Sequence, residues 1–484
     1  MISSADYIRV LPEIVLTLFG MAIMALEPLF PARASRRPLG WVALAGTLSA
    51  VAATLYQAGY PGLGFFGVVR VDAFSVFFHL LIGLIAALVI LASFDYLDSQ
   101  QVRGGEYYGL ILFGAVGMVL MSSAVELVLI FVALEISSIS TYILAGLRRR
   151  AAASAEASLK YFLLGSFATA FFLYGVALIF GATGTTNVAD VATALRSGQS
   201  SPLVYAAVAL MFVGIGFKVA SAPFHVWTPD VYEGAPSPVV ALMSTAPKAA
   251  AFAVMLRIFF AAAAPGWFWP VWISAALSMT LGNIGALVQQ NVKRMLAYSS
   301  IAHAGYLLVA FAAAREVGIS AAIFYSAAYA FMNVGAFVVV SHFARAGERY
   351  VAIDDYAGLG RRSPVLAATL TIFLLSLIGI PVTGGFFAKF LVFSAALKSN
   401  LVWLTIIGVV NSAIAAYYYL RVIVVMYMRD APDAPPLPRM RAPLAAALAV
   451  SVAATIYLGV LPGRVLDFAS RSASDLLQQQ LAKR

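Results

Sequence analysis

Five ionisable side chains lie in the middle of long apolar stretches of this chain. They are Glu135 in LIFVALEISSISTYIL, Lys218 in VGIGFKVASAPF, Lys248 in STAPKAAAFAV, His303 in YSSIAHAGYLL and Lys389 in GGFFAKFLVF. An ion surrounded by apolar residues is costly and is usually kept for a function. Lysine changes protonation state readily when it is buried, arginine stays charged, and histidine titrates near neutral pH. These residue types therefore support proton transfer.

Glu135 and Lys218 are interpreted as a switch. A nearby carboxylate favours the charged form of a buried lysine, so moving the carboxylate away promotes loss of the lysine proton. His303 is open to two interpretations, because a lone buried histidine is as often a satisfied core residue as a proton relay. The number of buried charges in one chain favours a functional role for the set.

Composition places these residues in a membrane. Among 484 residues, 62% are hydrophobic and 11% are charged, compared with about 25% charged in a soluble domain. Apolar stretches of about 20 residues recur along the chain, which is the length of a membrane-crossing helix. The alternating pattern of a membrane barrel is missing. The fold class predicted is an all-α polytopic membrane protein with about fourteen transmembrane helices.

The predicted spans share this length and apolar character. They lie near residues 8–30, 39–57, 73–95, 107–123, 125–147, 158–181, 203–224, 238–263, 269–289, 295–314, 318–343, 364–396, 401–428 and 443–461. Four segments follow from them: three N-terminal spans (1–103), two five-helix units (104–263 and 264–430), and a linker, last span and tail (431–484). The polar tail could form a short surface helix.

Helix-breaking residues interrupt two of the spans. The seventh contains Ser-Ala-Pro-Phe-His at 221–225, and the twelfth contains Gly-Ile-Pro-Val-Thr-Gly-Gly at 379–385. Proline removes a backbone donor and glycine adds freedom, so both spans are predicted to break, the seventh at Pro223, with FHVWTPDVYEGAP (224–236) as the inner bend between Lys218 and Lys248. The breaks are five spans apart, which predicts two inverted five-helix repeats and an ion path between them. The alternative is a pair of ordinary proline kinks.

The distribution of charge predicts orientation. Lysine and arginine concentrate in the loops on one side, which places both termini outside. This distribution argues against nucleic acid as a partner. The sequence has no cysteine, no phosphate-binding loop, no dinucleotide fingerprint and no metal-ligand cluster. We therefore expect no cofactor in this chain.

Four segments resemble one family. They are FKVASAPFHVWTPDVYEGAPSPVVALMSTAPKAAA (217–251), ASLKYFLLGSFATAFFLYGVALIFGATGT (157–185), NVKRMLAYSSIAHAGYLL (291–308) and IGIPVTGGFFAKF (378–390). Together they resemble the antiporter-like subunits of respiratory complex I, which are related to Mrp-type cation/proton antiporters. The form WTPDVYEGAP is similar to the subunit N branch, and the resemblance spans roughly residues 70–430.

The resemblance implies a proton-translocating subunit of the NADH:quinone oxidoreductase translocase. In the members it resembles, the fifth-span glutamate and seventh-span lysine form the coupling pair, here Glu135 and Lys218. Lys248 would continue a hydrated axis, and Lys389 matches the lysine of the N and L branches, where the M branch has glutamate. FMN, iron–sulfur clusters and quinone would belong to other subunits, and M-like and K/J/A-like subunits and membrane lipids would be its neighbours.

Two other interpretations stay open. The chain could be a subunit of an Mrp-type cation/proton antiporter, since the same lysines would serve there. It could also be a scaffold in which the buried charges no longer work. The N-type motif disfavours the first interpretation, and the number of buried ionisable groups disfavours the second.

Overall fold

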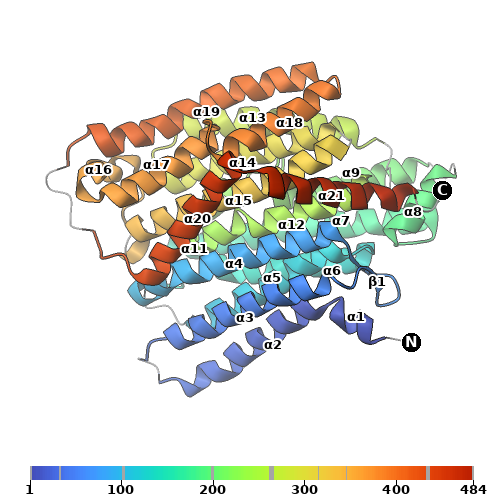
Figure 1. Cartoon of the computed structure of the whole chain (residues 1–484), viewed down its shortest axis with the longest axis horizontal. Coiled ribbons are helices and arrows are strands. Elements are labelled where there is room, and N and C mark those ends of the chain that lie inside the picture. Colours follow the sequence, from blue (N-terminus) through green and yellow to red (C-terminus); the bar gives the residue numbers. More distant parts are fainter. Residues whose placement is uncertain are drawn as a thin grey trace.

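Long apolar helices run side by side through this protein (Figure 1). The computed structural model describes residues 3–31, 34–100, 104–197, 201–260, 266–313, 316–344, 346–431 and 437–481. Within these residues, 13 helices are long and apolar enough to cross a membrane. Two shorter helices, α17 (Pro364–Ile378) and α18 (Gly384–Lys398), lie where the twelfth span was predicted. The prediction of an all-α polytopic membrane protein is confirmed.

The remaining elements follow in chain order. The N-terminal part has α1 (Ser4–Ile8), α2 (Leu11–Leu26), η1 (Glu27–Leu29), α3 (Arg37–Gln57), the antiparallel hairpin of β1 (Gly62–Gly64) and β2 (Val69–Val71), and α4 (Ala73–Gln100). The next part has α5 (Gly104–Ser123), α6 (Leu127–Ala145), α7 (Ala152–Thr183), α8 (Val188–Arg196), α9 (Pro202–Val219), α10 (Thr228–Gly234), α11 (Ser237–Met243), α12 (Ala246–Met255) and the π-helical turn η2 (Leu256–Phe260). The last part has α13 (Phe268–Leu287), α14 (Val292–Ala312), α15 (Glu316–Ala344), η3 (Ala346–Glu348), η4 (Ile353–Tyr356), α16 (Leu359–Arg362), α19 (Val402–Met428), α20 (Ala442–Val460) and α21 (Gly463–Leu481).

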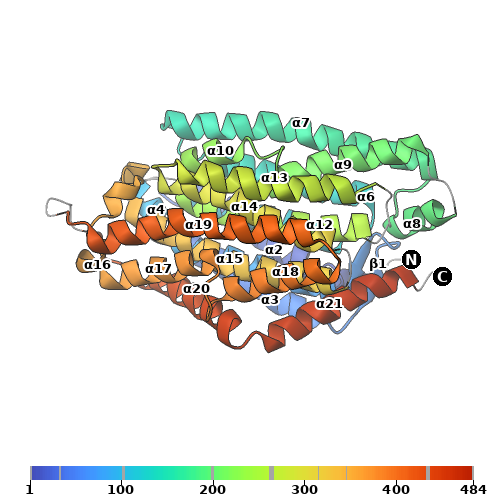
Figure 2. The same ribbon diagram turned by 90° about the horizontal axis from the view of Figure 1, so that it is seen from above.

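Three crossings form the centre of the bundle (Figure 2). Each helix was compared over its most apolar 18 residues. Of these, 100% are buried in the α11–α12 crossing and 94% in α14 and in α15. The peripheral helices α2, α7, α19 and α20 are at most 39% buried in the same sense, so they offer apolar side chains to lipid. Lys248 and His303 therefore belong to the most protected helices of the protein.

Both predicted helix breaks are observed. Helix α9 ends at Val219, and Ala220 follows with φ 59° and ψ 41°, three residues before Pro223. Between α17 and α18, Gly379 and Val382 also have positive φ values, 96° and 74°. The stretch 224–236, predicted as the inner bend, contains the short helix α10 (Thr228–Gly234) and is therefore partly helical. The inverted relationship of the two five-helix units stays a prediction.

A third interruption was not predicted. The eighth span was expected as one helix over 238–263, but α11 ends at Met243 and α12 begins at Ala246. Pro247 occupies the first turn of α12, where its missing N–H is tolerated. This interruption stands directly before Lys248. The last predicted residues of that span, 261–263, lie outside the described residues.

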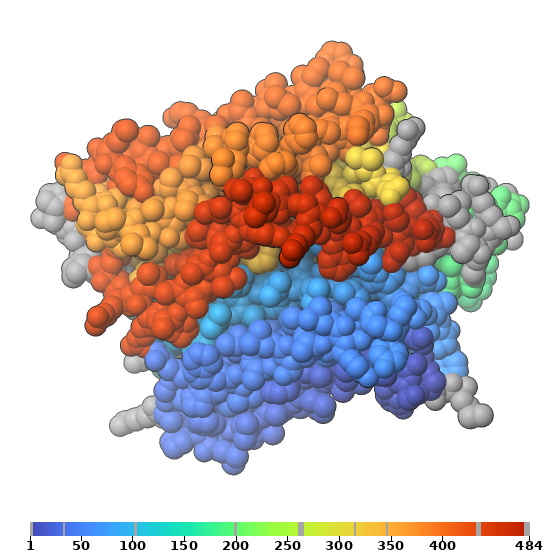
Figure 3. Space-filling view, in the orientation of Figure 1, coloured from blue at the N-terminus to red at the C-terminus, as the bar shows by residue number. Residues whose placement is uncertain are grey.

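The two chain ends lie at the same end of the bundle, which we call the termini end (Figure 1). The tail forms α21, as predicted, and the Asp475 carboxylate accepts a hydrogen bond from the Ala73 N–H at 3.0 Å, where α4 begins. Figure 3 shows α20 and α21 as a strip between the N-terminal helices and α17–α19. The side of the membrane that the termini end faces stays a prediction.

At the opposite end, Glu348 joins three parts of the chain. Its carboxylate accepts hydrogen bonds from Lys293 Nζ of α14, from the Tyr96 hydroxyl of α4 at 2.8 Å and from the Ser237 N–H of α11 at 2.6 Å. Burial by itself would raise the pKa of the Glu348 carboxyl. The charges of Lys293 and Arg148 and the hydrogen bonds to the carboxylate outweigh burial, so this pKa lies below its usual value.

Glu348→Gln should destabilise the fold by about 3–5 kcal/mol, because it leaves the buried Lys293 without its counter-charge. A lowered carboxyl pKa stabilises the protein above its unfolded-state pKa, and this stabilisation is lost as pH falls through the folded-state pKa. The difference in free energy of unfolding between Glu348→Gln and the wild type should therefore be largest at neutral pH and vanish in acid. Thermal unfolding at several pH values measures it.

The control is Glu106→Gln, which removes the exposed pair with Arg149 and should cost about 0–1 kcal/mol. Equal effects of the two variants would contradict the structural role of Glu348.

Candidate functional site

Lys218 lies buried in the last turn of α9, next to the break. Its Nζ donates a hydrogen bond to the Ser138 hydroxyl of α6 at 2.9 Å and stands 5.9 Å from the centre of the Tyr161 ring. Trp227 packs beside the break. Its ring centroid lies 4.4 Å from that of Tyr161 in a stacked arrangement, and its indole N–H donates a hydrogen bond of 3.1 Å to the Phe217 carbonyl. The broken helix thus holds an ammonium group against a hydroxyl and an aromatic face.

Glu135 lies on α6 one turn before Ser138, so the two residues share a face of the helix. Its Oε1 is buried and has no hydrogen-bond partner among the described residues. Within that part of the chain, Glu135 and Lys218 form no direct ion pair, so the predicted pairing is not a contact in this structure. Ser138 lies where a direct carboxylate partner of Lys218 was expected.

Lys248 begins the second half of the eighth crossing. Its Nζ donates to the Ser300 hydroxyl at 2.5 Å and to the Ser300 carbonyl at 3.1 Å. A cavity of about 10 Å³ adjoins the lysine, lined in part by Thr245, Ser326 and Tyr329. A space of this size is close to the smallest that holds one water molecule.

His303 follows Ser300 on the same face of α14, three residues further on. Its Nδ1 shares a hydrogen bond of 2.7 Å with the Tyr325 hydroxyl of α15. The Tyr329 and Tyr306 rings lie 5.1 Å and 5.6 Å from its ring. His303 is therefore placed between the Lys248 region and the next aromatic residue of α14.

Lys389 sits at the break between α17 and α18. Its Nζ donates to the Ile378 carbonyl at 2.8 Å and stands 4.7 Å from the centre of the Tyr306 ring. Ile378 is the last residue of α17, where backbone carbonyls lack helical partners and carry partial negative charge. The helix break thus supplies a neutral acceptor for a buried ammonium group.

The five predicted residues fall into two groups. Glu135 and Lys218 flank Ser138, while Lys248, His303 and Lys389 line one side of α14. Ser300, His303 and Tyr306 recur every three residues, so this helix carries a polar row from one lysine to the other. We call Lys248, Ser300, His303, Tyr306 and Lys389 the α14 row. With their hydroxyl and ring nitrogen groups, these residues can pass protons.

Sequence reasoning suggested that Asp230 caps the eighth helix or braces the inner loop, but it did not find the two partners of this carboxylate. The Asp230 carboxylate accepts from Lys160 Nζ of α7 at 2.6 Å and from Arg294 of α14 at 2.7 Å, so it fastens α10 to both helices. Partial burial would raise the pKa of Asp230, but these hydrogen bonds and charges lower it overall. No spacing in the sequence signals these partners, because they are 64 and 70 residues away.

Comparison with known proteins identifies the family. Residues 124–415 match the family described as "NADH:quinone oxidoreductase/Mrp antiporter, TM". The chain is 68% identical to NADH-quinone oxidoreductase subunit N 2 of Koribacter versatilis, and the alignment covers 99% of each chain. The chain belongs to the subunit N family of NADH-quinone oxidoreductases. Subunit N 1 of Solibacter usitatus is 50% identical over 97% of this chain and 98% of its own.

Solved structures agree with this family. A chain of respiratory complex I from Thermus thermophilus, with bound aureothin, superposes with a TM-score of 0.80 at 38% identity, covering 94% of this chain and 98% of that one. A chain of the Mrp complex from Dietzia sp. DQ12-45-1b has a TM-score of 0.84 at 22% identity, covering 96% and 97%. The second likeness shows the shared fold alone.

Two adjacent serines test the setting of Lys218. Ser138→Ala removes the hydroxyl that accepts from Lys218 and should destabilise the protein by about 1.5–3 kcal/mol, as for other hydrogen bonds to charged groups. The Ser137 hydroxyl is buried without a partner among the described residues, so Ser137→Ala should be neutral or stabilising. Thermal unfolding of the purified proteins measures both. Equal losses would show that Ser138 does not hold Lys218.

Proposed function

We propose that this chain translocates protons in the membrane arm of a bacterial NADH:quinone oxidoreductase, with Glu135, Lys218, Lys248, His303 and Lys389 as its proton-transfer residues. The observation that carries the proposal is the α14 row, which leads from Lys248 past His303 to Lys389 inside the most buried helices. Membership of the subunit N family supports it. The chain acts as part of a translocase and holds no redox centre itself.

The route we propose begins at the end of the bundle opposite the termini. Protons reach Lys218 and Lys248, cross the middle near His303 and leave past Lys389. Neutral partners suit such a path, because hydroxyls and carbonyls bind an ammonium group without fixing it as a permanent ion pair. A carboxylate in direct contact would hold the proton more firmly.

The energy must come from the rest of the complex. Moving one charge against a membrane potential requires about 2.3 kcal/mol per 100 mV. We propose that quinone reduction in partner subunits alters the influence of Glu135 on Lys218 and so drives the cycle. Glu135 lies on the same face as Ser138 but is not fixed in an ion pair with the lysine, so a small displacement changes the field at Lys218.

The names of the relatives support a proposal for the complex in which this chain works. Their names describe subunits of NADH-quinone oxidoreductase, and one superposed chain comes from a respiratory complex I. We therefore propose other complex I subunits as partners, with M-like and K/J/A-like neighbours, and place FMN, iron–sulfur clusters and quinone in them. The protein would lie in the bacterial inner membrane among lipids, with both termini in the periplasm.

Two lysines of α18 provide the test. Lys389→Met in the assembled complex should lower proton uptake by reconstituted vesicles about tenfold or more for the steps through this chain, because a general acid–base group is lost. Lys398→Met changes an exposed lysine at the end of the same helix and should leave pumping unchanged. Proton uptake and NADH oxidation are measured together in the same vesicles.

Normal uptake with Lys389→Met would reject the proposed route. An Mrp-type antiporter is the alternative, and the Mrp complex shares the fold. Purification of the native complex separates the two: flavin and iron–sulfur subunits should accompany this chain, and their absence would favour the antiporter.

A further inference from the structure

One buried tyrosine hydroxyl at the centre of the protein makes no hydrogen bond of standard geometry with the described residues. Tyr329 lies on α15 and is 4% exposed, yet its phenolic oxygen makes no hydrogen bond with the described residues. Buried hydroxyls normally have a hydrogen-bond partner, because packing alone does not compensate for the hydrogen bonds to water that are lost on burial. A tyrosine at this place, where phenylalanine would fill the same space, therefore requires a reason.

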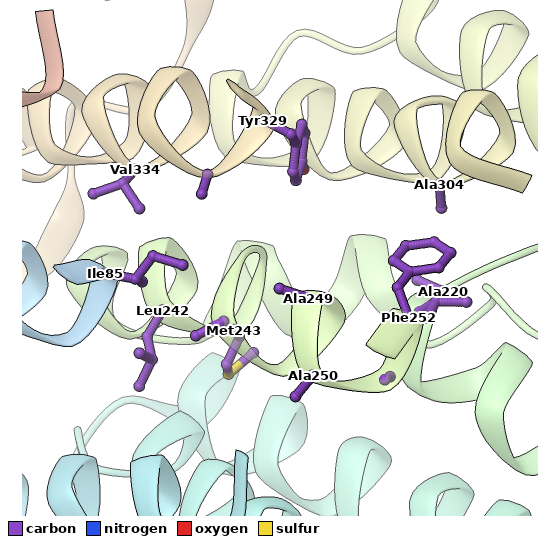
Figure 4. Packing of buried hydrophobic residues seen from close by; sticks show 14 of the residues in the cluster. Ile85, Ala220, Leu242, Met243, Ala249, Ala250, Phe252, Ala304, Tyr329 and Val334 are labelled. Atoms are coloured by element: carbon purple, nitrogen blue, oxygen red, sulfur yellow. The ribbon is translucent and has the colours of Figure 1, made fainter. Parts of the chain in front are cut away.

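The hydroxyl belongs to the cavity beside Lys248. Tyr329 lines this cavity of about 10 Å³ together with Lys248, Ser300 and Ser326. Figure 4 shows the Tyr329 side chain leaving α15 and pointing toward α12, where Ala249 lies on the facing side. Ala249 also lines the cavity, and its small side chain leaves room there. Tyr329 thus lines a space close to the smallest that holds one water molecule.

The same residue also contacts the next member of the α14 row. The Tyr329 ring lies 5.1 Å from the His303 ring, with an angle of 33° between the planes. Tyr325, one turn earlier on α15, already uses its hydroxyl to bind His303 Nδ1 at 2.7 Å. Tyr325 therefore orients the histidine, whereas the Tyr329 hydroxyl has the Ser300 side chain as a polar neighbour but makes no hydrogen bond of standard geometry with the described residues.

We propose that the Tyr329 hydroxyl is a proton relay between Lys248 and His303. This inference rests on the proposed function of the α14 row. In the step, the phenolic oxygen accepts a proton that originates at Lys248 Nζ and crosses the cavity through one water molecule. Its own O–H bond breaks, and that proton passes to the ring nitrogen of His303 that Tyr325 leaves unbonded. Because the hydroxyl and this nitrogen make no hydrogen bond in the structure, the transfer requires a side-chain rotation that first brings them into contact. The hydroxyl ends with one proton, and the positive charge moves from lysine to histidine.

Stability and pumping should respond in different ways to Tyr329→Phe. The substitution keeps the ring against His303 and removes only the unpartnered hydroxyl, so a structural role predicts unchanged or higher stability. A relay predicts a several-fold fall in protons taken up per NADH oxidised. Tyr356→Phe is the matched control, because Tyr356 is fully buried, its hydroxyl is also unpartnered among the described residues, and it stacks on Phe343 away from the cavity.

The experiment uses the whole complex in sealed vesicles, with proton uptake, NADH oxidation and thermal unfolding measured for Tyr329→Phe, Tyr356→Phe and Lys248→Met. The relay predicts lost uptake in Tyr329→Phe with unfolding at or above the wild-type temperature, and wild-type uptake in Tyr356→Phe. Wild-type uptake in Tyr329→Phe, or a loss that both tyrosine variants share, overturns the relay. If Lys248→Met also pumps normally, the proposed function itself fails; if only Lys248→Met loses uptake, the function stands without the relay.

Discussion

The cost of placing an ammonium group inside a membrane governs the design of this protein. Each of the three central lysines stands at a helix interruption: Lys218 before the end of α9, Lys248 after the gap between α11 and α12, and Lys389 beside the end of α17. Interrupted helices expose backbone groups that a continuous helix would use internally. The breaks and the charges therefore depend on each other. The end of α17, for example, supplies the Ile378 carbonyl as an acceptor for the Lys389 ammonium group, and this group supplies the donor for that carbonyl.

The partners of these lysines explain how a buried charge can remain mobile. Hydroxyls and carbonyls accept from the ammonium groups at 2.5–3.1 Å. Aromatic rings also lie against Lys218 and Lys389. Such partners lower the cost of burial without adding a counter-charge that would hold the proton in place. The buried pair of Lys293 and Glu348 has the opposite character. It carries opposite charges and several hydrogen bonds, and it fastens the end of the bundle instead of conducting.

Sequence patterns predicted the parts of this arrangement that depend on local chemistry. Apolar length predicted the crossings, and proline with glycine predicted the breaks near Pro223 and Gly379. The interruption before Lys248 was missed, although Pro247 lies well inside the predicted span 238–263, where proline kinks or breaks a helix. Ser138 and Ser300 could not be assigned to their lysines, which are 80 and 52 residues away. Such pairs arise from the packing of whole helices, which periodicity does not specify.

We propose that protons pass along the α14 row. A substitution at His303 is the most direct way to interrupt this row. This residue stands between the cavity of Lys248 and the Tyr306 ring beside Lys389. The decisive measurement is the number of protons taken up per NADH oxidised by vesicles that contain the complex with His303→Leu. If protons pass along the α14 row, the His303→Leu complex should take up fewer protons per NADH oxidised than the wild type while remaining fully assembled. An unchanged number would contradict this proposal, because protons would then cross without the histidine.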